Sequence, residues 1–239
     1  MPLLSALPII TIFRRRDFAP GCYHPKRWRG WWDFGTGIPG DWACHTLDAP
    51  FWALGLGAPT SVEVEVSDMD PWFVPKSSVL RYQFPARGNL PPVKLTWYEG
   101  PDARPDKPAD WPENTPFPAE GMLMIGSENT LYHASNPQSP RLVSDAAWEK
   151  LRRNRPKEWI PRVQGGPIAE WLRAIKGEGP TPGSNFDYAA DLTQVALLGT
   201  AAMRGGKNIE WNNRVGRIVN HPDLNRYIEI QARDGWKVA

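Results

Sequence analysis

The chain has little cysteine, little excess charge of either sign and no long apolar run. Its two cysteines, Cys22 and Cys44, are too few for a disulfide framework and lack the spacing of a zinc site. Small free thiols are typical of a reducing compartment, so a cytoplasmic location is expected. A net charge of +2, with scattered basic residues and no recognisable nucleic-acid-binding motif, argues against a nucleic-acid partner.

The longest apolar segment runs from Leu3 to Phe13, which is too short to cross a bilayer, and it contains Pro8. Its arginines follow it rather than precede it, which is unlike a signal peptide. No membrane partner is therefore predicted. With 239 residues, 41% of them apolar and 23% charged, the chain has the composition of an ordinary globular domain.

Tryptophan and proline, by contrast, are abundant, with 13 and 26 residues. Indole rings fill cores, and their flat faces also suit the C–H faces of sugars. Six of the prolines fall in residues 99–118, which are predicted to form a long irregular loop. A loop of this length in a compact domain is usually functional or disordered, and a lid over a pocket is one such role.

The apolar pattern predicts an α+β domain with a mostly antiparallel open sheet and helices on one face. It would span residues 22–239, behind a divergent N-terminal segment of residues 1–21. Strands are expected near residues 60–68, 78–85, 93–98, 121–126, 130–133 and 209–211. Helices are expected at 145–153, at 187–203, and at 167–176, the last with Ile168, Trp171, Leu172 and Ile175 inward.

Residues 35–48 combine titratable side chains with an apolar frame. A helix that begins at Asp41 and ends or kinks near Asp48, ahead of Pro50, would place Asp41, His45 and Asp48 on one face. In one interpretation Asp41 is only an N-cap and His45 is a core histidine bonded to Asp48. In the other, this face lines a pocket, where His45 acts as a general acid/base or metal ligand and the carboxylates orient it or share the metal.

The motif Gly40-Asp41-x-x-x-His45 resembles the Gly-Asp-x-x-x-His motif of the glucose–fructose oxidoreductase / inositol dehydrogenase (Gfo/Idh/MocA) family, in its bacterial members. The resemblance covers about residues 22–228. It implies the C-terminal substrate domain of that family, with Asp41 and His45 lining a sugar pocket and His45 exchanging a hydroxyl proton. It also implies a homo-oligomer formed through the open sheet face. Further segments that carry it are Tyr23-His24-Pro25-Lys26-Arg27-Trp28, Pro50-Phe51-Trp52-Ala53-Leu54 and Gly183-Ser184-Asn185-Phe186-Asp187-Tyr188.

The chain departs from that family because it has no Glu-Lys-Pro lysine motif and no N-terminal dinucleotide-binding domain of comparable size. Gly35-x-Gly37-x-x-Gly40 matches the dinucleotide fingerprint only formally. Trp- and Arg-rich residues precede it, Pro39 interrupts it, and Asp41 would repel a pyrophosphate. No cofactor is therefore expected through a Rossmann motif, and redox chemistry would need a separate dinucleotide-binding chain.

Three hypotheses for the function follow. The first is a domain that binds a sugar, polyol or lactone and does no NAD(P)-dependent redox chemistry alone. The second is a cofactor-independent lactone hydrolase, in which His45 activates water, or in which Asp41, His45 and Asp48 hold Ca²⁺, Mg²⁺, Zn²⁺ or Mn²⁺. The third is a structural oligomerisation domain. For the first two, catalytic roles are assigned to Asp41 and His45, and substrate contacts to Arg29, Trp31, Trp32 and Asp48.

Overall fold

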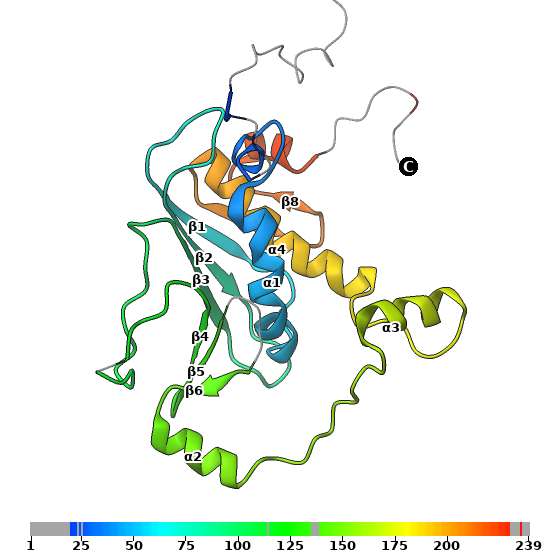
Figure 1. Cartoon of the computed structure of the whole chain (residues 1–239). Helices are drawn as coiled ribbons and strands as arrows, with labels where there is room; N and C mark the ends of the chain where they lie inside the picture. Colours follow the sequence, from blue (N-terminus) through cyan, green and yellow to red (C-terminus); the bar gives the residue numbers. More distant parts are fainter. Residues whose placement is uncertain are drawn as a thin grey trace, which may run out of the picture. The chain divides into compact units, whose positions relative to one another are not determined.

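The structure is a computed structural model that describes residues 20–22, 24, 26–113, 115–134, 139–229 and 235 (Figure 1). Most of the expected N-terminal segment, including the apolar stretch from Leu3, lies outside the described residues. The helices are η2 (Trp28–Gly30), α1 (Gly37–Ala53), α2 (Asp145–Arg153), α3 (Gly166–Ile175), α4 (Phe186–Gly205) and η3 (Pro222–Tyr227). The strands are β1 (Ser61–Val66), β2 (Ser78–Phe84), β3 (Val93–Glu99), β4 (Met122–Ile125), β5 (Thr130–His133), β6 (Arg141–Leu142), β7 (Ile209–Asn212) and β8 (Arg217–Ile218).

The chain forms two compact units. Unit 1 comprises Met1–Ala43, Leu56–Pro105 and Val195–Ala239, and unit 2 comprises Cys44–Gly55 and Asp106–Gln194. Within its described residues, unit 1 holds a five-stranded sheet of order β3-β2-β1-β7-β8, and unit 2 holds a three-stranded sheet of order β4-β5-β6. Every pair of neighbouring strands is antiparallel, so the predicted α+β class with a mostly antiparallel sheet is confirmed.

The core of unit 1 lies on one face of its sheet. Alternation places Val62, Leu80 and Tyr82 on that face, and each of them is at most 2% exposed. The second half of α4 packs there so closely that a Cβ on Gly199 would stand 1.8 Å from the Tyr82 hydroxyl. Only glycine fits that approach, so this position sets the distance between helix and sheet. Other α4 residues in this core are Val195, Ala196, Leu198, Ala201, Ala202 and Met203.

Helix α1 corrects two expectations. It begins at Gly37 rather than Asp41, because Pro39 is tolerated in a first helical turn, where backbone N–H groups have no intrahelical partner. It also continues through Pro50 to Ala53, whereas an end or a kink was expected near Asp48. A proline so near the C-terminal end removes one backbone bond, and the carbonyl of Pro50 still accepts from the N–H of Leu54 at 3.0 Å.

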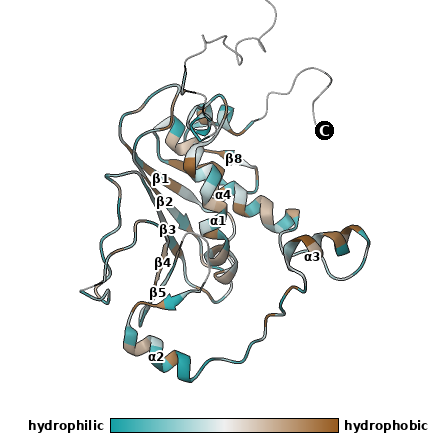
Figure 2. Cartoon of the chain, in the orientation of Figure 1, coloured by the Kyte–Doolittle hydropathy of each residue, from teal (hydrophilic) through white to brown (hydrophobic). Residues whose placement is uncertain are grey.

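Helix α3 of unit 2 lies where it was predicted, but the direction of its apolar stripe was predicted wrongly. Ile168, Trp171, Leu172 and Ile175 are 71%, 60%, 48% and 64% exposed. Figure 2 shows the hydrophobic colouring along α3. Periodicity gives the angular position of such a stripe and not whether a neighbouring element covers it, which explains the error.

The proline-rich loop begins later than predicted, since β3 includes Glu99. In unit 2 part of the loop packs: Trp111 meets Phe117 and Tyr132 edge-on, with ring centroids 5.0 and 5.8 Å apart. Among the described residues, no helix is long and apolar enough to span a membrane.

Candidate functional site

The three titratable residues singled out on α1 are all exposed, and the two carboxylates have different partners. Asp41, in unit 1, forms a salt bridge with Arg29. Asp48, in unit 2, accepts a hydrogen bond of 2.6 Å from the hydroxyl of Tyr188. Because α1 starts at Gly37, Asp41 is not the N-cap, and because His45 is exposed, it is not a core histidine. The purely structural interpretation of this segment is therefore wrong on both points.

The Tyr188–Asp48 contact is local to unit 2. The Tyr188 hydroxyl also lies 3.1 Å from the backbone carbonyl of Asp48, and its ring meets Phe51 edge-on, with centroids 5.7 Å apart. Burial, followed by the hydrogen bond to Asp48, raises the pKa of Tyr188, so this hydroxyl remains a donor at neutral pH. The bond occupies an Asp48 oxygen, which favours a positioning role for Asp48 over direct substrate contact.

The Arg29–Asp41 pair of unit 1 lies beside a short tryptophan-rich turn. Its side chains are 32% and 45% exposed, so both charged groups reach solvent. Trp31, next to η2, is half-buried and packs edge-on against Phe73 with centroids 5.2 Å apart. Trp32 differs, because it is only 7% exposed and the guanidinium of Arg204 lies 5.4 Å from its ring centroid. The burial of Trp32 favours a core role, whereas Trp31 is only half-buried.

A second polar group of unit 1 lies on the core face of its five-stranded sheet. In the antiparallel register of β2 and β3, Ser78 stands opposite Glu99 and Leu80 opposite Trp97. Ser78, Trp97 and Glu99 therefore share the face that carries Leu80. Within the described part of the chain, Ser78 Oγ, Trp97 Nε1 and Glu99 Oε2 are buried and have no hydrogen-bond partner.

Burial raises the pKa of Glu99 from an ordinary 4.5 to about 7. The indole N–H of Trp97 and the positive charge of Arg29 act in the opposite direction but do not cancel the effect of burial. Trp97 thus lies near enough to influence this carboxyl, although their geometry falls short of a proper hydrogen bond. Glu99 exchanges a proton around neutral pH, which is a property common in functional sites.

The sequence-based predictions missed this cluster of Ser78, Trp97 and Glu99. Glu99 was assigned to the loop because the prolines that follow begin at Pro101. The usable signal was the alternation from Val93 through Leu95 and Trp97, which places Glu99 on the same apolar face. A carboxyl in an inward position of a strand needs a partner or a shifted pKa, and here the pKa shifts.

The predicted cation gains no support from geometry. Across the described ranges, no group of three or more His, Cys, Asp or Glu side chains is arranged to hold a metal ion. The tentative assignment of a metal to Asp41, His45 and Asp48 stays a prediction.

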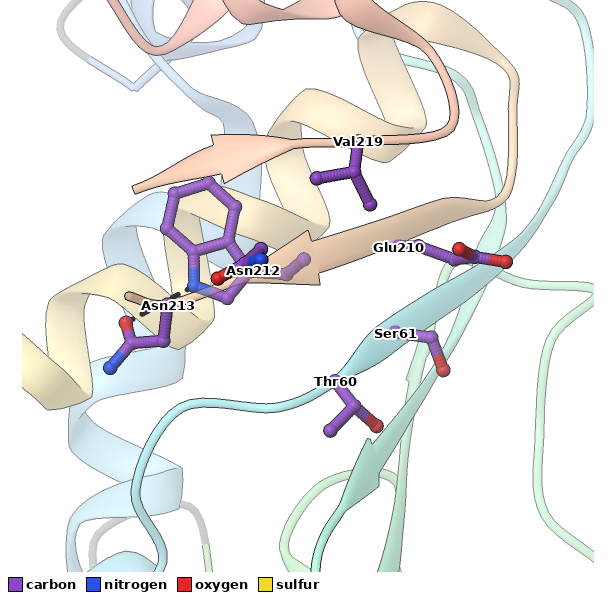
Figure 3. A pocket seen from close by; sticks show the side chains of 7 residues that line it. Thr60, Ser61, Glu210, Asn212, Asn213 and Val219 are labelled. Carbon is purple, nitrogen blue, oxygen red and sulfur yellow. Dashed lines mark hydrogen bonds between the residues drawn. The ribbon is translucent and has the colours of Figure 1, made fainter. Parts of the chain in front are cut away.

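A separate groove of about 530 Å³ lies at β1, β7 and β8 of unit 1 (Figure 3). Among its lining groups, the indole N–H of Trp211 donates to Asn213 Oδ1 at 3.2 Å. None of the residues proposed from the sequence lines it, and its one titratable side chain is that of Glu210. It offers a place for a ligand but little chemistry. The lining is formed by Thr60, Ser61, Glu210, Trp211, Asn212, Asn213 and Val219.

No protein-family model matches the chain, and no curated protein is significantly similar to it. The resemblance to the Gfo/Idh/MocA C-terminal domain, like the oligomer and the dinucleotide-binding partner that it implies, therefore stays a prediction.

Proposed function

We propose that the chain binds a small polyhydroxylated molecule, such as a sugar, a polyol or a sugar lactone, at the Arg29–Asp41 pair of unit 1. The observation that carries the proposal is this charged pair, open to solvent beside an aromatic turn. An exposed ion pair contributes only about 0–1 kcal/mol to folding, so stability is a weak reason for its presence.

The Arg29–Asp41 pair is chemically suited to bind two adjacent hydroxyl groups of a ligand. The guanidinium of Arg29 presents several N–H donors in a fixed plane, and the carboxylate of Asp41 accepts from hydroxyl protons. Trp28, which is 45% exposed, and the half-buried Trp31 flank Arg29 in the sequence and supply flat apolar faces for C–H groups. Convergent polar groups with aromatic walls are typical of small-molecule sites. The resemblance of Gly40-Asp41-x-x-x-His45 to a sugar-oxidoreductase motif points to the same ligand class.

The proposal is tested by calorimetric titration of the whole chain with D-glucose, myo-inositol, xylitol and D-glucono-1,5-lactone. We expect at least one compound to bind, and Asp41→Asn to weaken that binding about tenfold or more, because a charge-assisted hydrogen bond is worth about 1.5–3 kcal/mol. Glu65→Gln is the matched control, since Glu65 forms an exposed pair with Arg81 at 2.7 Å on unit 1. Equal losses in both variants, or no binding across the panel, would refute the proposal.

Lactone hydrolysis by His45 is a more specific hypothesis, and it can be tested with the D-glucono-1,5-lactone of the same set of compounds. Acid release from the lactone above its spontaneous rate without protein, lost in His45→Ala while sugar binding persists, would add a hydrolase to the binding function. An unchanged excess over the spontaneous rate in that variant would remove His45 from any such mechanism. The third hypothesis, a structural oligomerisation domain, predicts no binding at all.

A further inference from the structure

Helix α3 of unit 2 exposes its apolar face and turns its charged residues inward. On the inward face Glu170 and Arg173 are half-buried, and Glu170 Oε1 accepts a hydrogen bond from the backbone N–H of Gly183 at 3.4 Å. A helix in water normally buries its apolar face against its own protein, so this orientation indicates a partner outside the chain. The apolar stripe of α3 consists of Ile168, Trp171, Leu172 and Ile175 (Figure 2).

The exposed apolar surface is not confined to α3. In the irregular segment that precedes the helix, Trp159 is 83% exposed, and Ile160 and Val163 are exposed as well. Seven large apolar side chains within residues 159–175 are therefore open to solvent. Exposed apolar groups that gather in this way mark interaction sites, and Trp is enriched where protein meets the boundary between lipid and water.

The same part of unit 2 is strongly basic. From the last turn of α2 to the C-cap of α3, Lys150–Lys176 contains eight Lys or Arg residues and two Glu, a formal net charge of +6, whereas the remainder of the chain is net acidic. All of these basic side chains except that of Arg173 are exposed. Arg152 and Arg162 form exposed ion pairs with nearby glutamates at 2.9 and 4.0 Å, which are weak enough for an anionic partner to replace.

Charge and apolar surface together define the partner. A second copy of the chain would bring two segments of net charge +6 together, which is unfavourable. A nucleic acid would match the charge but would leave the apolar stripe in water. A bilayer with anionic headgroups satisfies both, because basic side chains are attracted to its surface and apolar side chains enter the boundary beneath the headgroups.

We propose that Lys150–Lys176 of unit 2 binds the surface of an anionic lipid bilayer, with the apolar stripe of α3 below the headgroups and the basic side chains against them. This inference goes beyond the proposed sugar binding and does not depend on it. The absence of a membrane partner was expected because the sequence lacks an apolar run that could cross a bilayer. A helix that lies in the interface needs no such run.

The test is co-sedimentation of the whole chain with vesicles of phosphatidylcholine alone and of equal parts phosphatidylcholine and phosphatidylserine. We expect binding to the anionic vesicles that is at least tenfold tighter than to the neutral ones. Trp171→Ser should weaken it at least fivefold, since an apolar ring no longer enters the lipid. Trp52→Ser is the matched control, because Trp52 is also 60% exposed in unit 2 but lies outside the stripe. Arg155→Glu should weaken binding at least tenfold, and the exposed Arg104→Glu should not.

Several results would overturn the proposal. Binding that survives Trp171→Ser, or that falls equally in Trp52→Ser, would show that the stripe does not enter lipid. Equal binding to neutral and anionic vesicles, or equal losses in Arg155→Glu and Arg104→Glu, would remove the role of the basic segment. If the wild type binds neither kind of vesicle and forms a dimer that Trp171→Ser dissociates, the face belongs to a second copy and the proposal falls. Failure to bind anionic vesicles in any oligomeric state would also refute it.

Discussion

Glu99→Gln should abolish a pH dependence of stability that the buried carboxyl imposes. Glutamine keeps the shape of glutamate and cannot ionise, so it removes only the titration. A carboxyl whose pKa is higher in the folded state than in the unfolded chain binds its proton more tightly when folded. Its contribution to stability is therefore complete below the ordinary pKa of 4.5 and is lost as the pH rises through about 7.

The magnitude follows from that pKa change. At about 1.4 kcal/mol for each pH unit between pH 4.5 and pH 7, the wild type loses about 3 kcal/mol that Glu99→Gln keeps. The variant should match the wild type within about 1 kcal/mol near pH 4.5 and exceed it by about 3 kcal/mol at pH 8. Burial is the main cause of this difference, while Trp97 and Arg29 reduce it.

The assay is urea denaturation of both proteins at intervals from pH 4.5 to pH 8.5, followed by tryptophan fluorescence. The difference between the two free energies of unfolding isolates Glu99, because other ionisable groups cancel. Glu65→Gln serves as the control, since Arg81 lowers the pKa of Glu65 and its contribution changes below pH 4.5, outside this range. A flat difference for Glu99→Gln would refute the reasoning, and a difference that falls with pH would show a stabilising ion pair instead.

Three further predictions concern the fold. In denaturation experiments Gly199→Ala should destabilise the protein by about 1–3 kcal/mol, because the added methyl group overpacks against the Tyr82 hydroxyl. Adding Tyr82→Phe removes that hydroxyl, so the double variant should recover part of the lost stability. Asn225→Ala should cost about 2–4 kcal/mol, because the buried amide bonds both the N–H and the C=O of Ile218; a loss below 1 kcal/mol would contradict this. Trp171→Ser should change the free energy of unfolding by less than about 0.5 kcal/mol, because the Trp171 side chain is exposed. It should also reduce self-association in light scattering, since it removes part of an exposed apolar stripe. A larger loss of unfolding free energy would show that another element covers α3.

The central strands could be predicted because their alternation is complete. In β1 and β2 every second residue faces the core, and this period is visible in the sequence from Val62 and from Leu80. Helix α1 was harder, because rules for Pro50 and for a capping Asp41 describe average helices. Prolines are tolerated near both ends of α1, because the first N–H groups and the last C=O groups of a helix have no intrahelical hydrogen-bond partner.

The candidate site shows a similar division. Arg29 and Asp41 were both selected from the sequence, and the structure pairs them. The partner of Asp48 could not have been found in this way, since Tyr188 lies 140 residues away. Glu99 was missed because its environment is created by residues of another strand, including Ser78. Local patterns thus gave candidate residues, whereas partners, burial and shifted pKa values required the fold.

The most direct test of the account is an NMR titration that follows the tryptophan indole N–H signals as D-glucose, myo-inositol, xylitol or D-glucono-1,5-lactone is added. We predict that the Trp31 signal shifts as the ligand binds beside Arg29 and Asp41, whereas the signals of Trp111 and Trp211 stay in place. Shifts confined to Trp211 would place the ligand in the groove of Figure 3. That result, or no shift with any compound, would contradict the proposed site.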